Sequence, residues 1–132
     1  MSTLVSPASP SLPAGSSAEL ELPSVSFFGR SLAQYVKFFA LDLVALKDRD
    51  VLDVAAGPSS FTAEACIRRV DAVAVDPAYG DPGAGLAARV ASDYVRMHDQ
   101  IRTRRRRFRL GASFPSLAAA ETDREGAARR FL

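Results

Sequence analysis

The chain has 132 residues, the usual size of one domain, and its 48% apolar and 24% charged residues are ordinary for a soluble globular protein. A formal charge of +2 is too small to predict a polyanionic partner for the chain as a whole, and no apolar run approaches the roughly 18 to 20 residues that cross a bilayer. Because residues 1–29 contain no lysine or arginine and no compact apolar core, they do not match a secretory signal, and we expect a cytoplasmic location.

The amino-terminal segment, residues 1–26, is predicted to be a disordered tail rich in serine and proline. It holds eight serines and four prolines and shows little apolar periodicity. Such a composition buries too little surface to offset the entropy cost of an ordered backbone. We therefore expect the folded part of the chain to span residues 27–132.

A helix, a strand, a second helix and a second strand are predicted next. Ser31 can cap the first helix, whose apolar positions recur every three or four residues at Leu32, Tyr35, Val36, Phe39, Leu43 and Leu46. Residues 51–54 then form a short strand that is apolar or small on both faces except at Asp53, as in a parallel strand covered by helices. A helix over about residues 60–69 leads to the second strand, residues 72–75.

The single cysteine, Cys66, falls in the predicted helix of residues 60–69. One cysteine excludes an intrachain disulfide framework and a multi-cysteine metal cluster, and His98 has no second histidine with which to hold a metal. We therefore expect no metal site, and we expect a buried, unreactive thiol at Cys66.

The rest of the chain is predicted to turn and then to be helical. Two prolines and two glycines within residues 76–83 require a turn. A helix over residues 86 to about 109 follows, with an apolar stripe at Leu86, Val90, Tyr94, Met97 and Ile101. Residues 111–115 break it, and a last helix spans about residues 116–131. The expected fold class is α/β: a partial doubly wound parallel sheet with flanking helices, apparently truncated after its second strand.

The loop between the two strands carries the candidate binding site. Residues 55–60 are small or compact, so a ligand can approach the unpaired amides at the start of the following helix. Asp76 follows Gly57 by nineteen residues and ends the next strand, where a carboxylate can accept both hydroxyls of a ribose. The pattern predicts a nucleoside-containing ligand; a small-residue turn that only packs the helix on the strand is the alternative.

The loop sequence indicates which nucleoside. A dinucleotide fingerprint needs three glycines, and only Gly57 is present, with Ala55 and Ser60 at the other two places. The run from Asp53 through Ala55, Ala56, Gly57, Pro58 and Ser59 instead resembles motif I of the class I S-adenosylmethionine-dependent methyltransferases, which are Rossmann-like. The resemblance implies that Asp53 lies near the methionine ammonium of the cofactor. It also implies that the backbone of residues 55–57 lines the sugar and methionine portion, and that Asp76 holds the ribose.

The resemblance covers residues 27 to about 80. The family's fold has seven strands and this sequence predicts two, so residues 27–132 look like the amino-terminal part of a longer methyltransferase, without the residues that select the methyl acceptor. Ala55 and Ser59 carry a Cβ where the family usually has glycine. By the same resemblance Arg30 can pair with the cofactor carboxylate, although a solvated arginine at a helix start is the alternative. Tyr79 can stack near the adenine or fill the loop.

Two other functions stay open. A nicotinamide-dependent dehydrogenase fragment shares the acid at the strand end but needs the absent glycines. A non-catalytic basic module binding nucleic acid is the other, because residues 96–109 hold seven arginines and one acid. The dense part of this run comprises Arg102, Arg104, Arg105, Arg106, Arg107 and Arg109. Only Phe108 is an aromatic that could stack on a base there, and a solvated helix end is the simpler explanation.

Overall fold

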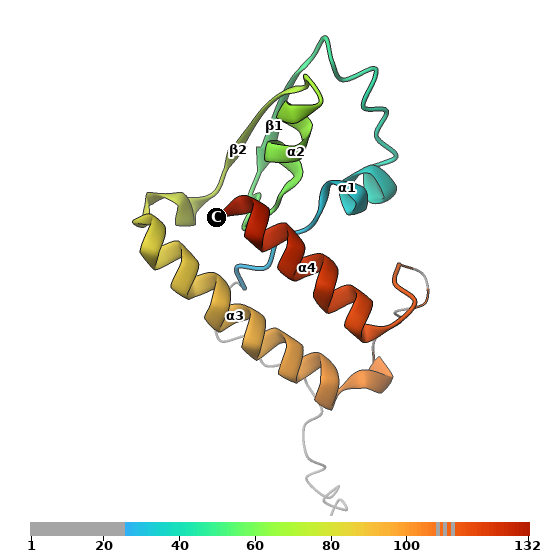
Figure 1. Ribbon diagram of the computed structural model, residues 1–132, viewed down its shortest axis with the longest axis vertical. Helices are drawn as coiled ribbons and strands as arrows, with labels where there is room; N and C mark the ends of the chain where they lie inside the picture. The colour runs from blue at the N-terminus through green and yellow to red at the C-terminus, as the bar shows by residue number, and fades with distance from the viewer. Residues whose placement is uncertain (1–25, 108, 110, 112) are drawn as a thin grey trace, which may run out of the picture.

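The computed structural model describes residues 26–132 apart from residues 108, 110 and 112 (Figure 1). The predicted tail lies outside the described residues except for Ser26. The elements, in chain order, are α1 (Leu32–Phe39), β1 (Asp50–Val54), α2 (Phe61–Ile67), β2 (Asp71–Val75), the 3₁₀ turn η1 (Pro77–Gly80), α3 (Gly83–Thr103), the 3₁₀ turn η2 (Arg105–Arg107) and α4 (Leu117–Phe131). The chain is therefore a mixed α/β protein, and both predicted strands are present.

The two strands pair in parallel, with Asp53 opposite Ala74 and Val54 opposite Val75. A parallel pair needs a crossover connection, which α2 supplies. The face of the sheet toward α1 and α2 carries the short or half-buried side chains of β1 and β2. A core of Leu32, Phe61, Ala65, Val70 and Ala72 forms between this face and the two helices. Burial of that single apolar layer holds the sheet and its helices together.

The opposite face of the sheet is apolar and exposed. Leu52 and Val54 of β1 pair with Val73 and Val75 of β2, and these side chains are 62, 67, 56 and 41% exposed. Within the described residues, helices thus cover one face of the sheet, whereas a doubly wound fold has helices on both faces.

A second core joins α3, α4 and the segment before α1. It consists of Phe27, Ala78, Val90, Tyr94 and Ala128. The Tyr94 hydroxyl donates to the Arg124 carbonyl at 2.9 Å, and Arg102 pairs with Glu121 at 2.9 Å. These contacts place α3 and α4 side by side and antiparallel, as Figure 1 shows. Leu86, Val90 and Tyr94 of the amphipathic stripe predicted for α3 are therefore in the packed part of the helix.

The first helix is shorter than predicted. The Ser31 cap is confirmed, because its side chain accepts from the amide of Gln34, but α1 ends at Phe39. Ala40 adopts a left-handed conformation (φ 49°), and the amide of Leu41 bonds back to the Val36 carbonyl at 3.1 Å. This is the usual way in which a chain leaves a helix. Phe39 is consequently 64% exposed, and the last two positions of the predicted stripe reach the core from the turns after α1.

Two further predictions are corrected. Cys66 is exposed rather than buried, because α2 buries Phe61 and Ala65 on one face and the next position points away from it. The helix predicted to reach residue 109 ends at Thr103, and the Arg104 amide still bonds to the Gln100 carbonyl before η2 begins. The run of arginines therefore continues past the end of α3.

Candidate functional site

The loop from Ala55 to Ser60 reverses the chain at the carboxyl end of β1. Ala55 and Gly57 both have positive φ, 56° and 57°. Only glycine adopts this left-handed conformation without an energetic cost. The conformation is therefore unstrained at Gly57 and strained at Ala55. Space is open where a Cβ on Gly57 would lie, since no atom comes within 4 Å of that position. The glycine is therefore required by the backbone conformation and not by a close protein neighbour.

Asp76 lies directly against this loop. One of its carboxylate oxygens accepts from the Gly57 amide at 3.0 Å, and the other accepts from the Ala78 amide at 2.8 Å. The acid thus caps η1 and also joins the end of β2 to the glycine turn. A carboxylate has about four lone-pair directions, so the two amides leave acceptor capacity free on both oxygens.

Asp53 is held on the helical side of the sheet by Tyr35. The Tyr35 hydroxyl lies 3.1 Å from both carboxylate oxygens, and its ring stacks on Phe61 with centroids 4.5 Å apart. Burial raises the pKa of the Asp53 carboxyl above its ordinary value, while the hydrogen bond from Tyr35 acts in the opposite direction. Tyr35 is therefore both a core aromatic and the partner that orients the acid.

The segment before α1 lies across the loop. A Cβ built on Gly29 would come within 2.1 Å of the backbone of Pro58, so the two segments are in direct backbone contact. The Arg30 carbonyl accepts from the Ser60 amide at 3.1 Å and from the Ser59 hydroxyl at 2.9 Å. Ser59 also accepts from the Phe61 amide at 3.1 Å. Ser59 therefore ties this segment to the start of α2.

Two cavities flank the loop and meet at Arg30, Tyr35 and Ala55. One, of about 150 Å³, also contains Gly57 and Asp76; the other, of about 370 Å³, contains Asp53. Small-molecule sites usually measure about 300 to 1,000 Å³. The smaller cavity is thus too small for a whole nucleoside ligand and could hold one part of it. Asp76 lines the smaller cavity and Asp53 lines the larger one, so the two acids would contact different parts of a ligand.

The predicted site residues fall into two groups. Asp53, Ala55, Gly57, Asp76 and Arg30 line one or both of the two cavities, and Ala56 lines the smaller one. Pro58 is fully buried and Ser59 is 6% exposed, so they support the loop and do not face a cavity.

Tyr79 fills space beside the loop. Its hydroxyl donates to the Gly57 carbonyl at 2.6 Å, and its ring stacks on Phe131 with centroids 5.5 Å apart. Burial, followed by the nearby charge of Asp76, raises the pKa of Tyr79 to about 12. The hydroxyl therefore stays protonated near neutral pH and keeps the glycine turn in place.

Sequence reasoning missed Gly29 and Arg89. Arg89 lines the smaller cavity, and its guanidinium lies over the ring of Phe27 at 5.1 Å. No motif marks an arginine on α3 as a neighbour of a loop thirty residues earlier. Gly29 carries a weak signal, because glycine is the residue that permits close approach of a backbone.

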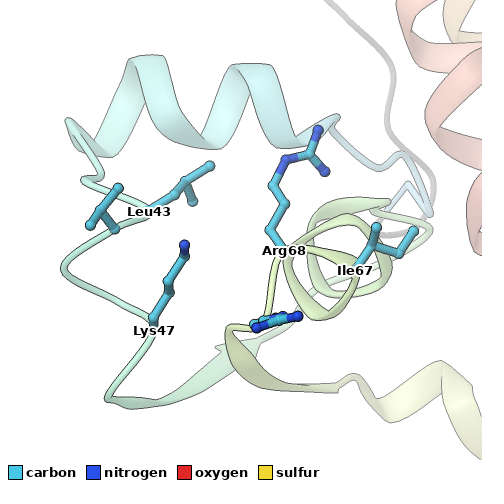
Figure 2. Close-up of a pocket in the computed structure, with 6 residues that line it drawn as sticks. Leu43, Lys47, Ile67 and Arg68 are labelled. Atoms are coloured by element: carbon cyan, nitrogen blue, oxygen red, sulfur yellow. The ribbon is translucent and has the colours of Figure 1, made fainter.

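Another cavity lies away from the loop. It measures about 400 Å³ and is lined by Leu43, Val44, Lys47, Ile67, Arg68 and Arg69. Figure 2 shows the side chains that line it, among them Lys47 from the turn after α1 and Arg68 at the end of α2. Both segments precede strands, so this cavity is at the amino end of the sheet. Ligands of open α/β sheets bind at the carboxyl ends, where Asp76 and the glycine turn lie.

The other sequence candidates lie away from the loop. His98 is buried between α3 and α4, and Arg105, Arg106 and Arg107 form the exposed turn η2. Among residues 26–132 other than 108, 110 and 112, no three histidine, cysteine or acidic side chains are placed to hold a metal ion. Within the same residues no helix is long and apolar enough to span a bilayer.

Comparison with known proteins finds no relative of this chain. The chain matches no protein-family model, no curated protein and no solved structure, so the likeness of its loop to motif I stays a resemblance of residues.

Proposed function

We propose that this chain binds S-adenosylmethionine through Asp53, the backbone of residues 55–57, Asp76 and Arg30, with Pro58 and Ser59 supporting the loop, as part of a class I methyltransferase. The observation that carries the proposal is the 3.0 Å contact between the Asp76 carboxylate and the Gly57 amide. It brings the acid at the end of β2 and the glycine turn after β1 into one site. A nucleoside site needs both groups within the span of one ribose.

The Asp76 side supports ribose binding. Each carboxylate oxygen holds one backbone amide and keeps a free lone pair, so the pair can accept two neighbouring hydroxyls. The Ala78 and Gly57 amides fix the carboxylate plane before any ligand arrives. A preorganised acceptor loses less entropy on binding than a mobile side chain.

The Asp53 side supports binding of the methionine portion. Asp53 lines the larger cavity, and Arg30 lines both cavities. An ammonium group would meet the carboxylate that Tyr35 orients, and a carboxylate would meet the exposed Arg30 side chain. The zwitterionic end of the cofactor thus finds one charge of each sign beside the loop.

The bound cofactor would supply an activated methyl group. The residues of this chain would contribute binding and orientation, and in-line transfer gains rate from positioning alone. We assign no catalytic residue and no methyl acceptor.

The exposed face of the sheet bears on the fold to which this chain belongs. Four aliphatic side chains on one sheet face are a typical surface for packing helices. We propose that the sheet is part of a doubly wound fold in which elements other than those described cover Leu52, Val54, Val73 and Val75.

Calorimetric titration with S-adenosylhomocysteine and, separately, with NADH tests the proposed function. We expect heat and saturation with the first ligand and none with the second. Binding of NADH alone would favour the dehydrogenase alternative. Binding of neither ligand by folded protein would contradict the proposal, and retention on RNA that is lost on charge reversal of Arg104 to Arg107 would favour the basic module.

A further inference from the structure

We propose that the arginine-rich turn after α3 binds the phosphate backbone of a nucleic-acid duplex. This turn comprises residues 104–107 and is named here the arginine turn. It follows the carboxyl end of α3, whereas Asp76 and η1 precede the amino end of that helix (Figure 1). A helix of 21 residues is about 30 Å long, so the arginine turn is separate from the cavities beside the glycine turn. The inference therefore does not rest on binding of S-adenosylmethionine.

The end of α3 explains only the first arginine of the run. Arginine near a helix C-terminus interacts favourably with the helix dipole, but the effect is confined to the last turn. The basic residue in the last turn of α3 is Arg102, and its guanidinium is paired with Glu121 at 2.9 Å. Arg105, Arg106 and Arg107 follow on the separate turn η2. A solvated helix end therefore leaves these three arginines without an explanation.

The charge of the arginine turn is not neutralised by nearby acids. Residues 100–120 contain six arginines and no acidic residue. Among the described residues, neither ion pair involves the arginine turn. Its last three residues are exposed, and Arg104 is half-buried. Four adjacent cations without an acid repel one another, and a bound polyanion would relieve that repulsion.

A cavity of about 330 Å³ lies among the arginine side chains. It is lined by Thr103 and by the four residues of the arginine turn, and no acid contributes to it. The Arg107 amide bonds to the Arg104 carbonyl at 2.9 Å, the contact of a 3₁₀ turn, which places these two residues on the same side. Guanidinium groups form paired hydrogen bonds with phosphate oxygens. The cavity is therefore complementary to phosphate in both charge and hydrogen bonding.

The composition of the arginine turn favours a duplex over other polyanions. The turn has no apolar side chain, whereas stable attachment to a membrane surface usually combines basic residues with an apolar or lipid group. Residues 102–107 include no aromatic side chain on which an unpaired base could stack, and Phe108 lies outside the described residues. A duplex keeps its bases stacked inside and presents one phosphate charge per about 1.7 Å. Arginines that contact only this backbone bind without regard to base sequence.

Fluorescence anisotropy of a labelled DNA duplex, titrated with the full chain at several salt concentrations, tests the proposal. If four arginines contact phosphates, the logarithm of the affinity should fall against the logarithm of the salt concentration with a slope of about −3 to −4. Two duplexes of different sequence should bind equally. Absence of binding at about 0.05 M salt, a strong sequence preference, or tighter binding of the single strand would overturn the proposal.

Two double variants locate the contact. Arg105→Gln combined with Arg106→Gln removes two exposed charges from the arginine turn. Arg129→Gln combined with Arg130→Gln removes two exposed charges at the other end of α4, close to the chain terminus in Figure 1. Circular dichroism checks that both variants are folded.

The first double variant should reduce the salt slope by about 2 and weaken duplex binding by about tenfold or more at about 0.1 M salt. The control variant should bind nearly as the wild type does, because exposed charges more than about 10 Å away are largely screened at this salt concentration. Equal weakening by both variants would show that only the net charge matters and would refute the assignment to the arginine turn.

Two other polyanions distinguish a nucleic acid from any negatively charged partner. Extended polyglutamate carries one charge per about 3.4 Å, half the charge density of a duplex, and should bind about tenfold more weakly. Vesicles containing phosphatidylserine should not retain the chain through the arginine turn. Polyglutamate binding as tight as duplex binding, or vesicle binding that the first double variant loses, would overturn the proposal.

The duplex titration contains no S-adenosylhomocysteine, so its outcome is separate from the test of the proposed function. Binding of both ligands would support both proposals. Binding of the duplex alone would support the arginine turn and leave the non-catalytic basic module as the function. Binding of S-adenosylhomocysteine alone would overturn only the inference about the arginine turn.

Discussion

Ala55 is the residue at which the loop departs most clearly from what its sequence favours. It stands where the motif usually has glycine, and it still adopts φ 56°. A left-handed conformation costs an L-residue about 1 to 2 kcal/mol. The loop therefore keeps the glycine-like backbone shape without the glycine, which means that surrounding hydrogen bonds hold it. One of them is the bond from the Ala56 amide to the Val75 carbonyl at 3.2 Å.

The strain at Ala55 predicts that a substitution by glycine will not destabilise the fold. Ala55→Gly relieves the left-handed strain but gives the unfolded chain more freedom, so the free energy of unfolding should stay equal or rise by about 1 kcal/mol. The neighbouring Ala56→Gly, at a buried residue with ordinary φ, should lower it by about 1 kcal/mol. Chemical denaturation of the two variants measures the difference. Equal destabilisation by both would show that Ala55 is not strained.

Asp53 predicts a pH-dependent stability effect. Its pKa in the folded chain is raised from the ordinary value of 3.8, chiefly by burial, so the folded chain binds this proton more tightly than the unfolded chain. The free energy of unfolding contributed by Asp53 therefore falls as pH rises from 3.8 through the raised pKa. Asp53→Asn should be more stable than the wild type at pH 7, with the advantage shrinking as pH is lowered toward 3.8.

Thermal unfolding at a series of pH values tests this effect. The exposed Asp50→Asn, on the same strand, controls for the loss of one negative charge. An advantage of Asp53→Asn that does not change with pH, or that Asp50→Asn shares, would contradict the assignment to burial of Asp53.

At the scale of elements, the segment before α1 and the glycine turn act as one unit. The contact at Gly29 allows no side chain, and the Arg30 carbonyl then joins the segment to Ser59 and Ser60. Anything that separates the segment from the turn opens both cavities at once. The candidate site thus depends on a segment that precedes the loop resembling motif I and that lies outside the resembling residues.

Gly29→Ala should therefore be among the more damaging single changes. The added Cβ meets backbone atoms that cannot rotate away, and overpacking of this kind costs about 1 to 3 kcal/mol. Gly83→Ala, at the start of α3 with open space around the Cβ, should leave stability unchanged or raise it by up to about 1 kcal/mol. Urea denaturation of both variants compares them; a tolerated Gly29→Ala would mean that the segment does not lie against Pro58.

At the scale of the whole molecule, the elements that the structure describes bury the sheet on one side only, and substitutions at two valines test this. Val73→Thr, on the exposed face, should change the free energy of unfolding by less than about 0.5 kcal/mol. The same substitution at Val70, which is 2% exposed, buries a hydroxyl and should cost about 1 to 3 kcal/mol. Denaturation of the two variants gives the comparison. A large cost at Val73 would show that this face is covered in solution.

The sequence predicted the parts of this fold that depend on local chemistry. The Ser31 cap, both strands and the stripe of α3 follow from hydrogen-bonding groups and apolar spacing, and all are present. The proximity of Asp76 to Gly57 followed from parallel strands ending at one edge. The end of α1, with Ala40 as its C-cap, could not be predicted, because alanine normally continues a helix. Tertiary packing overrides this local preference. The cavity of about 310 Å³ between α3 and α4 depends on how two helices distant in the sequence meet, and no local sequence pattern predicts that.

The affinity of S-adenosylhomocysteine for Asp76→Ala, compared with Asp81→Ala, tests the central claim most directly. Both changes remove one acid from neighbouring positions, but only Asp76 contacts the glycine turn, and Asp81 is exposed. We expect Asp76→Ala to bind the ligand about 1 to 3 kcal/mol more weakly than the wild type, the scale for losing a hydrogen-bonded acid. Asp81→Ala should bind as the wild type does. Equal affinity of folded Asp76→Ala and Asp81→Ala would remove Asp76 from the site and contradict the account.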